Sequence, residues 1–466
     1  MRMLRGDFGI ALHPLARSIP LVPIPFMTLD KTHRVIDAVW RIESAKIIAS
    51  IARMVGDVGL AEDLAQDSLV AALEKWPEAG VPDNPGAWLM ATAKHRAIDT
   101  VRRKKMLERK HAEIGVELEE SQELDGDALA EAIDDDIGDD LLRLIFTACH
   151  PVLSTEARVA LTLRLLGGLT TTEIARAFLV PEPTIAQRIV RAKKTLADSK
   201  VPFEVPRGDD RAARLSSVLE VIYLIFNEGY SATSGDDLIR PGLCDDALRV
   251  GRILAELASD EAEVHGLVAL MEIQASRARA RVSAGGEPIL LLDQDRSRWD
   301  QLLIRRGLSA LQRADDLDVA PGPYHLQAAI AACHARARTA GETDWHRIAS
   351  LYELLMRVSP SPVVELNRAV AVSMADGAQR ALEIVDRLVS QETLKSYHLL
   401  QSVRGDLLFK LGRYDEAKNE FETAAAMTKN ARENALLLKR AADCLQMMNG
   451  DDGSARTVRE HEAQPS

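Results

Sequence analysis

Helical patterning restricts the fold of this chain more than any other feature of its sequence. Apolar residues recur at helical spacing in most segments, and long runs of β-branched residues are rare. Ala, Leu, Arg and Glu dominate the composition, and residues of this kind favour helices. We therefore predict an all-α fold. At 466 residues the chain is too long for one hydrophobic core, and its length suggests about three domains.

The overall composition is that of an ordinary folded soluble protein, with 47% hydrophobic and 27% charged residues. No apolar run approaches the roughly 18 residues that a membrane span needs, so we expect no membrane partner. The cysteines are far apart and form no C-x-x-C pair: Cys149, Cys244, Cys333 and Cys444. We therefore expect no disulfide framework, no structural zinc and a reducing, cytoplasmic location.

Composition also divides the chain into segments. Residues 1–27 form an N-terminal extension, either a functional tail or the product of a mis-assigned start with Met27 as the true first residue. The remaining segments are a helical unit over 28–110, an acidic linker over 111–140, a helical unit over 141–200, a helical region over 207–450 and a tail over 451–466. The linker is set apart by charge, because residues 113–140 include thirteen Asp and Glu and no Lys or Arg.

The stretch "LTTTEIARAFLVPEPTIAQRIVRAKKTL" (169–196) predicts two short helices broken at Val180-Pro181-Glu182-Pro183. Pro183 suits the first turn of the second helix, where its missing N–H costs nothing. The expected buried positions are Ile174, Ala175 and Phe178 in the first helix and Ile185, Ile189 and Leu196 in the second. The outward face carries the DNA-binding candidates Thr184, Gln187, Arg188, Arg191 and Lys194. These residues can enter a major groove, although a solvated basic face on an ordinary helical hairpin is the alternative.

A second pattern runs from Gly59 to Lys105. On the helix that begins at Ala61, one face carries Asp63, Gln66, Asp67 and Val70, and the expected buried face carries Ala65, Leu69, Leu73 and Trp76. On the next helix, from Trp88 to Lys105, a polar arc of Thr92, His95, Arg96, Asp99, Arg102 and Arg103 is expected to oppose Ala87, Ala91, Ile98 and Val101. Basic side chains on such an arc can hold the backbone of a melted DNA strand.

The segment from Gly59 to Lys105 resembles conserved region 2 of extracytoplasmic-function (ECF) sigma factors. The segment "LSTEARVALTLRLLGGLTTTEIARAFLVPEPTIAQRIVRAKKTL" is similar to region 4 of the same family, and the resemblance covers roughly residues 30–199. The family implies two partners, core RNA polymerase (its clamp and flap surfaces) and promoter DNA. It also implies that the acidic linker passes near the RNA exit path, where the linker is either a flexible spacer or a mimic of nucleic acid.

The resemblance assigns roles to individual residues. It implies that Asp63, Gln66 and Asp67 dock on a basic coiled coil of the polymerase clamp, with a merely solvated acidic stripe as the alternative. It implies downstream-element binding and melting by His95, Arg96, Arg102 and Arg103, with Asp83 and Asn84 of "EAGVPDNPG" near a pocket for an extruded base. Asp99 is expected only to bridge Arg96 or Arg103, and Trp76 and Trp88 to pack in the core.

The C-terminal half contains an internal repeat. "LLFKLGRYDEAKNEFETAAAM" places Gly412, Tyr414, Ala417, Phe421 and Ala424 at the spacing of a tetratricopeptide helix pair. The pattern recurs around Ile348 and Ala381, at intervals of 33 and 36 residues. "YLIFNEGYSATSG" and "GGEPILLLDQDRSRWD" also resemble the ECF subgroup with a tetratricopeptide-like extension. We predict an α-solenoid-like regulatory domain with a protein or peptide ligand.

One motif could indicate an enzyme. Asp293 and Asp295 form a D-x-D that could hold a divalent cation, but helix caps with a bridge to Arg296 are the favoured interpretation. No nucleophile triad, phosphate loop or dinucleotide motif is present, so we expect no enzymatic activity, no cofactor and no metal. The sequence therefore predicts an ECF-type sigma factor with an attached regulatory domain. The alternative is a helix-turn-helix activator with a repeat-built sensor, which would not need the segment 30–105.

Overall fold

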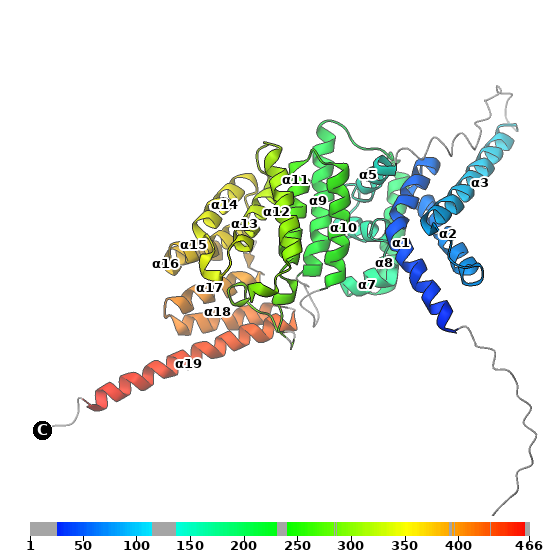
Figure 1. Ribbon diagram of the computed structural model, residues 1–466. Coiled ribbons are helices and arrows are strands. Elements are labelled where there is room, and N and C mark those ends of the chain that lie inside the picture. Colours follow the sequence, from blue (N-terminus) through cyan, green and yellow to red (C-terminus); the bar gives the residue numbers. More distant parts are fainter. Residues whose placement is uncertain are drawn as a thin grey trace, which may run out of the picture.

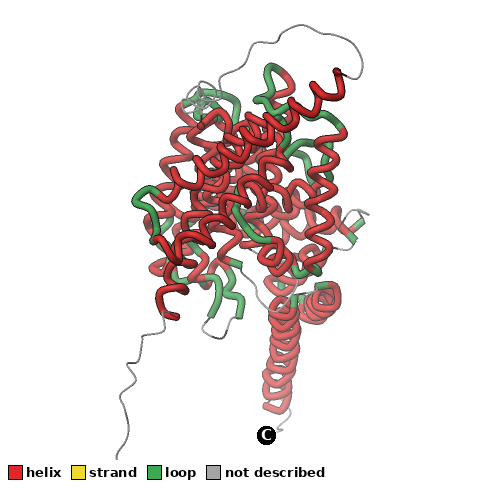
Figure 2. Tube along the Cα trace, turned by 90° about the vertical axis from the view of Figure 1, so that its right-hand side faces the viewer, coloured by secondary structure: helices red, strands yellow, loops and turns green. Residues whose placement is uncertain are grey.

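The computed structural model describes residues 26–113, 137–230, 240–283, 285, 287–390, 394–395, 397–428 and 430–461. Throughout these residues the regular elements are helices, and an isolated bridge of extended backbone joins Val282 and Pro288. The predicted all-α fold is confirmed (Figures 1 and 2). The N-terminal extension, most of the acidic linker and the last five residues lie outside the described residues.

Three helices form an N-terminal unit: α1 (Phe26–Val55), α2 (Val58–Ala79) and α3 (Pro85–Glu113). Gly56 turns the chain between the first two helices at φ +69°, and Asp57 caps α2 by accepting a hydrogen bond from the Leu60 N–H at 2.9 Å. Trp76 is 2% exposed and meets Trp88 edge to face at 5.4 Å. Both tryptophans therefore pack as predicted.

The buried face of α3 is not the predicted one. Leu89, Ala93 and Ala97 are fully buried, whereas Ala87 and Ala91 are exposed. The buried residues follow an i, i+4, i+8 row, and the two alanines in that row let α3 lie close against α1 and α2. On α2 the prediction for Leu73 was also wrong, because the neighbouring Ala72 takes the buried position and Leu73 is 37% exposed.

A middle unit follows, made of α5 (Ile137–Ala148), α6 (Thr155–Leu165), α7 (Thr171–Phe178) and α8 (Glu182–Asp198). A capping box between Thr170 and Glu173 starts α7, and Leu179 ends it in the left-handed conformation at φ 51°. The break and the start of α8 lie where the sequence predicted them, with a proline in the first turn.

Helix α5 begins at Ile137 rather than at residue 141, inside the acidic run. Asp140, the last residue of that run, is 1% exposed. It pairs with Arg143 one turn later and with Arg53 of α1, whose Nη1 lies 3.6 Å from the carboxylate. The last acidic residues thus belong to a folded element because basic partners compensate their burial.

The C-terminal unit is a stack of helices, each packed against the next along the chain (Figure 1). The longer helices are α9 (Asp209–Tyr230), α10 (Pro241–Leu257), α11 (Ala262–Ala275), α12 (Gln301–Asp316), α13 (Pro323–Arg336), α14 (Trp345–Val358), α15 (Pro362–Ala375), α16 (Ala378–Val389), α17 (His398–Lys410), α18 (Tyr414–Met427) and α19 (Ala431–His461). Short 3₁₀ turns lie at η2 (Ala278–Ala280), η3 (Leu291–Asp293), η4 (Arg296–Arg298) and η5 (Ala340–Glu342). This arrangement is the predicted α-solenoid.

The repeat residues occupy the expected places in that stack. Gly412 turns the chain between α17 and α18 at φ +75°, and Ala417, Phe421 and Ala424 are fully buried. A Cβ added at Gly405 would lie 2.9 Å from the ring of Phe421, so the two helices need glycine at their closest approach.

One hydrophobic core crosses all three units. It runs through buried side chains from Ile36 of α1 to Met271 of α11, with members from α2, α3 and the four helices of the middle unit. Helix α1 packs on α5 and α6, and α9 packs on both of them from the other side. The middle unit is therefore held between the other two. Among the described residues, no helix is long and apolar enough to cross a membrane.

Candidate nucleic-acid and polymerase interface

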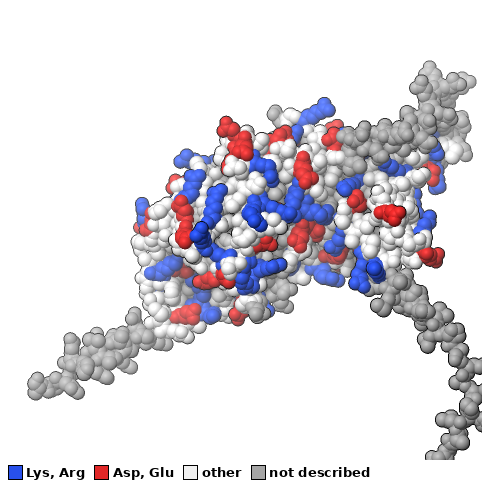
Figure 3. All heavy atoms as spheres, viewed as in Figure 1, with Lys and Arg blue, Asp and Glu red and all other residues white. Residues whose placement is uncertain are grey.

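Helix α8 presents a polar, basic face to solvent. Its apolar positions Ile185 and Ile189 are buried against α6 and α7, which fixes the rotation of the helix. That rotation leaves Thr184, Gln187, Arg191 and Lys194 exposed and Arg188 half-buried. Neither Arg188 nor Arg191 forms an ion pair with any described residue, and basic side chains gather where α7 and α8 lie (Figure 3). The predicted DNA-binding face is thus available to a phosphate backbone or base edges.

Lys193 of the same helix points the other way, toward the N-terminal unit. Its Nζ lies 2.5 Å from Glu62 Oε2 and 3.3 Å from Asp63 Oδ1. Glu62 also accepts a hydrogen bond from Arg164 Nε at 2.5 Å and another from Gln66. Because Glu62 is 2% exposed, this carboxylate is the buried centre of the contact between α2 and the middle unit.

Sequence reasoning missed Glu62. The signal was its spacing, since Glu62 lies three residues before the buried Ala65 and therefore falls on the apolar face of α2. An acidic side chain on a buried face needs a cation, and the sequence alone does not say which of many cations supplies it.

The predicted polymerase contacts Asp63 and Asp67 are 71% and 58% exposed. Both already have intramolecular partners, because Asp67 Oδ2 lies 3.1 Å from Arg96 of α3 and Asp63 pairs with Lys193. Asp99 was expected to bridge to Arg96 or Arg103, but among the described residues it forms no ion pair with either, and Arg96 meets Asp67 because α3 lies beside α2.

The downstream-element candidates are spread along α3. Asp83, Asn84, His95, Arg102 and Arg103 are exposed and Arg96 is half-buried. Asn84 accepts a hydrogen bond from the Ala87 N–H at 3.1 Å, which makes it the cap of α3. Helix α3, which carries the four basic candidates, runs away from α8 on the other side of α2 (Figure 1). The structure does not bring these residues and the α8 face together.

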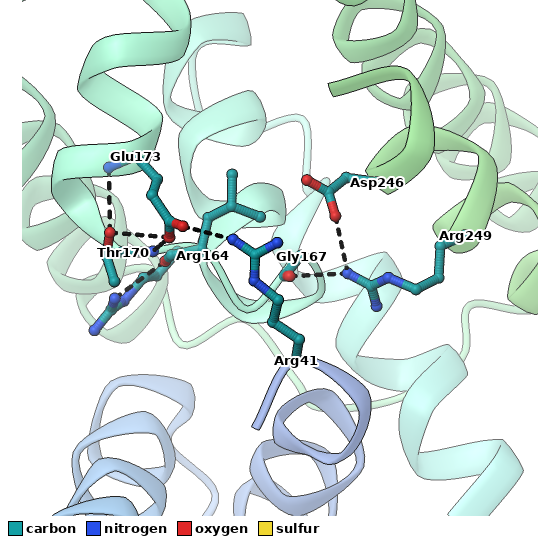
Figure 4. Close-up of polar contacts among 8 residues, drawn as sticks. Arg41, Arg164, Gly167, Thr170, Glu173, Asp246 and Arg249 are labelled. Atoms are coloured by element: carbon teal, nitrogen blue, oxygen red, sulfur yellow. Dashed lines mark hydrogen bonds and ion pairs between the residues drawn. The ribbon is translucent and has the colours of Figure 1, made fainter. Parts of the chain in front are cut away.

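A second link joins the N-terminal and middle units through Arg41 of α1 (Figure 4). Its Nη2 lies 2.5 Å from Glu173 Oε1, and Thr170 donates to the same carboxylate from its N–H at 2.8 Å and from its hydroxyl. Burial, the largest single effect, raises the pKa of Glu173, but the hydrogen bonds from Thr170 and the Arg41 guanidinium together lower it below the ordinary value. The carboxylate that starts α7 is therefore also an anchor for α1.

On the other side, arginines of the C-terminal unit bind carbonyl oxygens of the middle unit. Arg249 of α10 donates to Leu166 at 2.9 Å and to Gly167 at 2.8 Å (Figure 4). Arg240 donates to the carbonyl of Ala177, at the end of α7. Because these carbonyls lie at helix ends, the guanidinium groups satisfy acceptors that have no partner within their helix.

Helix α9 adds further contacts to the same unit. Arg214 donates to the carbonyl of Phe146 at 2.9 Å, and Ser217 to that of Cys149 at 2.8 Å. Arg158 of α6 pairs with Glu220 at 3.1 Å and also donates to Ser217. The middle unit is thus clamped by side chains from both of its neighbours.

Of the two D-x-D residues, Asp295 has the cap role that was favoured for the motif. Asp295 accepts a hydrogen bond from the Ser297 N–H at 2.9 Å, but the predicted bridge to Arg296 is wrong. Arg296 instead donates to the carbonyls of His334 at 2.7 Å and Ala337 at 2.8 Å, joining the loop to the end of α13. In the described part of the chain, no group of three His, Cys, Asp or Glu residues is placed to hold a metal ion.

Three stretches of the chain match known families. Residues 43–106 match the family described as Sigma-70 region 2, and residues 143–196 match the family described as Sigma-70, region 4. Residues 214–315, which cover α9 to α12, match a family of unknown function (DUF6596). The first two matches correspond to the N-terminal and middle units.

Three known proteins are similar to this chain over different lengths. An uncharacterised protein of Rhizobium meliloti (strain 1021) is 43% identical over 391 residues, which are 84% of this chain and 91% of that protein. A probable ECF RNA polymerase sigma factor, SigI, of Mycobacterium tuberculosis is 26% identical over 182 residues, which are 38% of this chain and 60% of SigI. The ECF RNA polymerase sigma factor SigC of the same species is 30% identical over 149 residues, which are 32% of this chain and 75% of SigC. The similarity to the Rhizobium protein is long enough to include much of the C-terminal unit.

Proposed function

The chain belongs to the ECF sigma factors of the sigma-70 family, and on this premise we propose that it binds core RNA polymerase, recognises and melts specific promoters, and directs transcription initiation. The observation that carries the proposal is the presence of both regions in one chain, region 2 in α1–α3 and region 4 in α5–α8. A helix-turn-helix activator would need the second region alone.

In this proposal the exposed face of α8 reads the upstream, minus-thirty-five type element. Gln187 and Arg188 lie where a helix entering a major groove meets base edges, and Arg191 and Lys194 lie where it meets phosphates. On α3, Arg102 and Arg103 hold the backbone of the melted strand, and Asp83 with Asn84 borders the pocket for an extruded base. Asp63, Gln66 and Asp67 meet the polymerase clamp.

We further propose that the C-terminal unit, a tetratricopeptide-like extension, controls the sigma half. The support is the pattern of contacts, in which α9 and α10 bind the middle unit while α1 and α2 bind it from the other side. In this arrangement Asp63 and Asp67 are occupied by Lys193 and Arg96. A polymerase surface that binds these aspartates therefore competes with intramolecular cations.

In this proposal the contact between Lys193 and Glu62 holds regions 2 and 4 in a closed arrangement, which opens when the chain binds polymerase and promoter. A domain that binds the closed state more tightly than the open one shifts this equilibrium by the difference in binding free energy.

The test is transcription in vitro from a specific promoter with purified core RNA polymerase. We expect the full chain to convert core enzyme into a promoter-specific initiating enzyme, whereas an activator would work only with a sigma factor already present. If transcripts appear only when another sigma factor is added, the proposal is wrong.

The regulatory part has a separate test. A chain ending at Ser199 should transcribe at a rate that differs at least several-fold from the full chain, upward or downward. Because this truncation also uncovers the apolar side of α5 and α6, the variant Arg249→Ala serves as the matched comparison: it removes the two hydrogen bonds of Arg249 to the middle unit and leaves the core intact. Equal transcription by all three proteins would contradict a regulatory role.

A further inference from the structure

The C-terminal unit contains a cavity that the sigma activity does not use. The cavity has a volume of about 560 Å³ and lies where α9, α11, α13, α14 and α15 converge. This volume is in the range of pockets that hold small molecules, about 300–1,000 Å³. The cavity is separate from the α8 face and from the basic surface of α3, because none of its lining residues comes from the N-terminal or middle unit.

The wall of the cavity combines apolar side chains with polar groups that converge from different helices. Tyr223 and Asn227 come from α9, Tyr352 from α14 and Asn367 from α15. The side chain of Asn367 is exposed and makes no hydrogen bond to any other described residue, so its amide is available to a ligand. None of the lining side chains in the described part of the chain is a carboxylate.

The single charged group in the wall is Arg277, just after α11. Its guanidinium donates to the hydroxyl of Tyr230 and to Gln274, and it lies 5.8 Å from the ring centres of Tyr230 and Trp299. These contacts hold the group in place without neutralising it, because no described carboxylate pairs with it. Its Nε is buried and has no hydrogen-bond partner. A partly buried cation without a counter-ion is unfavourable, and an anion in the cavity would relieve that cost.

His334 of α13 is a second group without a full set of partners. The residue is only 9% exposed, it lines the cavity, and its Nδ1 has no hydrogen-bond partner. Burial, and then the charges of Arg277 and Arg296, lower the pKa of His334 to about 4. The imidazole is therefore neutral at physiological pH and adds no second charge, while it keeps one donor and one acceptor for a ligand.

We propose that this cavity binds a small ligand with one carboxylate, which pairs with Arg277 while the amide, phenol and imidazole groups bind its polar atoms. One guanidinium and no other charge match a monoanion better than a phosphate dianion, which would need a second cation. The apolar part of the wall suits an aromatic or aliphatic body. The carboxylate has two possible sources, a free organic acid or the C-terminus of a peptide.

Helix α9 connects this site with the sigma half. Tyr223 and Asn227 line the cavity on one stretch of the helix, and Ser217 and Glu220 hold Arg158 of region 4 one to two turns earlier. A ligand that shifts α9 would change the contacts of Ser217 and Glu220 with Arg158 of region 4. This coupling rests on the proposed function, whereas ligand binding itself does not.

Binding is tested on the full chain with matched probes, by ligand-observed NMR and thermal unfolding. Benzoate carries the carboxylate, benzamide is its neutral analogue and phenyl phosphate is the dianionic one. We expect benzoate to bind with a dissociation constant on the order of 1 mM. Benzamide and phenyl phosphate should bind at least about tenfold more weakly, because they lose the charge-assisted hydrogen bond or the charge match. A dipeptide and its C-terminal amide form the second pair: tighter binding of the dipeptide acid than of benzoate identifies a peptide terminus as the source, and weaker binding identifies a free organic acid.

Variants locate the site. Arg277→Gln should abolish the preference for benzoate, and Arg279→Gln, which removes an exposed arginine two residues away, should leave it unchanged. Arg277→Gln also loses the contact with Tyr230. Asn367→Phe therefore provides a second test, because it places a larger side chain in the cavity wall and leaves Arg277 in place. Equal binding of benzoate and benzamide, an unchanged preference in Arg277→Gln, or no binding of any probe would overturn the proposal. These assays contain no polymerase, so their failure is distinct from a failure of the sigma activity.

Discussion

Replacing Glu62 by Gln should open the contact between regions 2 and 4. The side chain is 2% exposed and faces two cations, Lys193 and Arg164, which are 19% and 20% exposed. The substitution keeps the size and a hydrogen-bonding oxygen but removes the negative charge. Arg164 then remains largely buried without a counter-ion, and Lys193 keeps only its pair with the exposed carboxylate of Asp63.

The size of the effect follows from that burial. Removing one partner of a fully buried ion pair costs about 3–5 kcal/mol. Since both cations keep some contact with water, we expect the lower end of this range, about 3 kcal/mol, which is a factor of about 100 in the equilibrium between open and closed forms. Asp63→Asn is the matched control on the adjacent residue. Its carboxylate is 71% exposed and 3.3 Å from the same Lys193, so its loss should cost at most about 1 kcal/mol.

The assay is a distance measurement between spin labels on the two regions. Glu74→Cys on α2 and Asp198→Cys on α8 place labels at exposed positions. The native thiols react slowly with the labelling reagent, because burial raises the pKa of Cys149 to about 11 and that of Cys244 to about 12 and also raises those of Cys333 and Cys444. We expect long distances to appear in the Glu62→Gln protein and not in the Asp63→Asn protein. Identical distance distributions in wild type and Glu62→Gln, with identical unfolding midpoints, would refute this account of the interface.

Three further predictions concern DNA, polymerase and pH. Gln187→Ala and Arg188→Ala should each weaken binding of the holoenzyme to the upstream element by roughly 1–3 kcal/mol and relax specificity there, which gel shifts with mutated elements would measure. Replacing Asp63 and Asp67 together by Lys should abolish co-purification with core polymerase while the circular dichroism spectrum stays helical; normal co-purification would remove these residues from the interface. The lowered pKa of His334 means that the unfolded chain binds this proton first, so the C-terminal unit should lose stability as pH falls from 6.5 to about 4. His334→Gln should flatten this loss in thermal unfolding, and an unchanged pH slope would show that other groups cause it.

Local features of the fold were predictable where the sequence carries a local signal. The α7–α8 break was predictable because Pro181 and Pro183 interrupt an otherwise regular helical pattern, and the burial of Ile185 and Ile189 follows from their spacing. The start of α5 was not, because its first turn lies in an acidic run that looks like linker. The burial of Asp140 is compensated by Arg143 one turn later and also by Arg53, which is far away in the sequence.

The contacts of the candidate site depend on tertiary packing and were harder to predict from the sequence. Spacing places Asp67 on an exposed face, but only the packing of α3 beside α2 identifies Arg96 as its partner. The same holds for Lys193, which the sequence presents as one of four basic residues on α8. Lys193 differs from the other three basic residues because it pairs with the buried Glu62 and so lies away from the DNA-binding face.

The hydrophobic core that continues from Ile36 to Met271 also determines how the chain unfolds. Regions 2 and 4 and the first solenoid helices share this core, so they should unfold as one cooperative unit with one set of slowly exchanging amide hydrogens. The last helices have their own core, from Leu366 to Cys444, and each packs mainly on its neighbours, so they should unfold separately and at lower free energy. Amide exchange rates should then change near α13, well inside the C-terminal unit. They should not change at the boundary that the sequence suggests near residue 200.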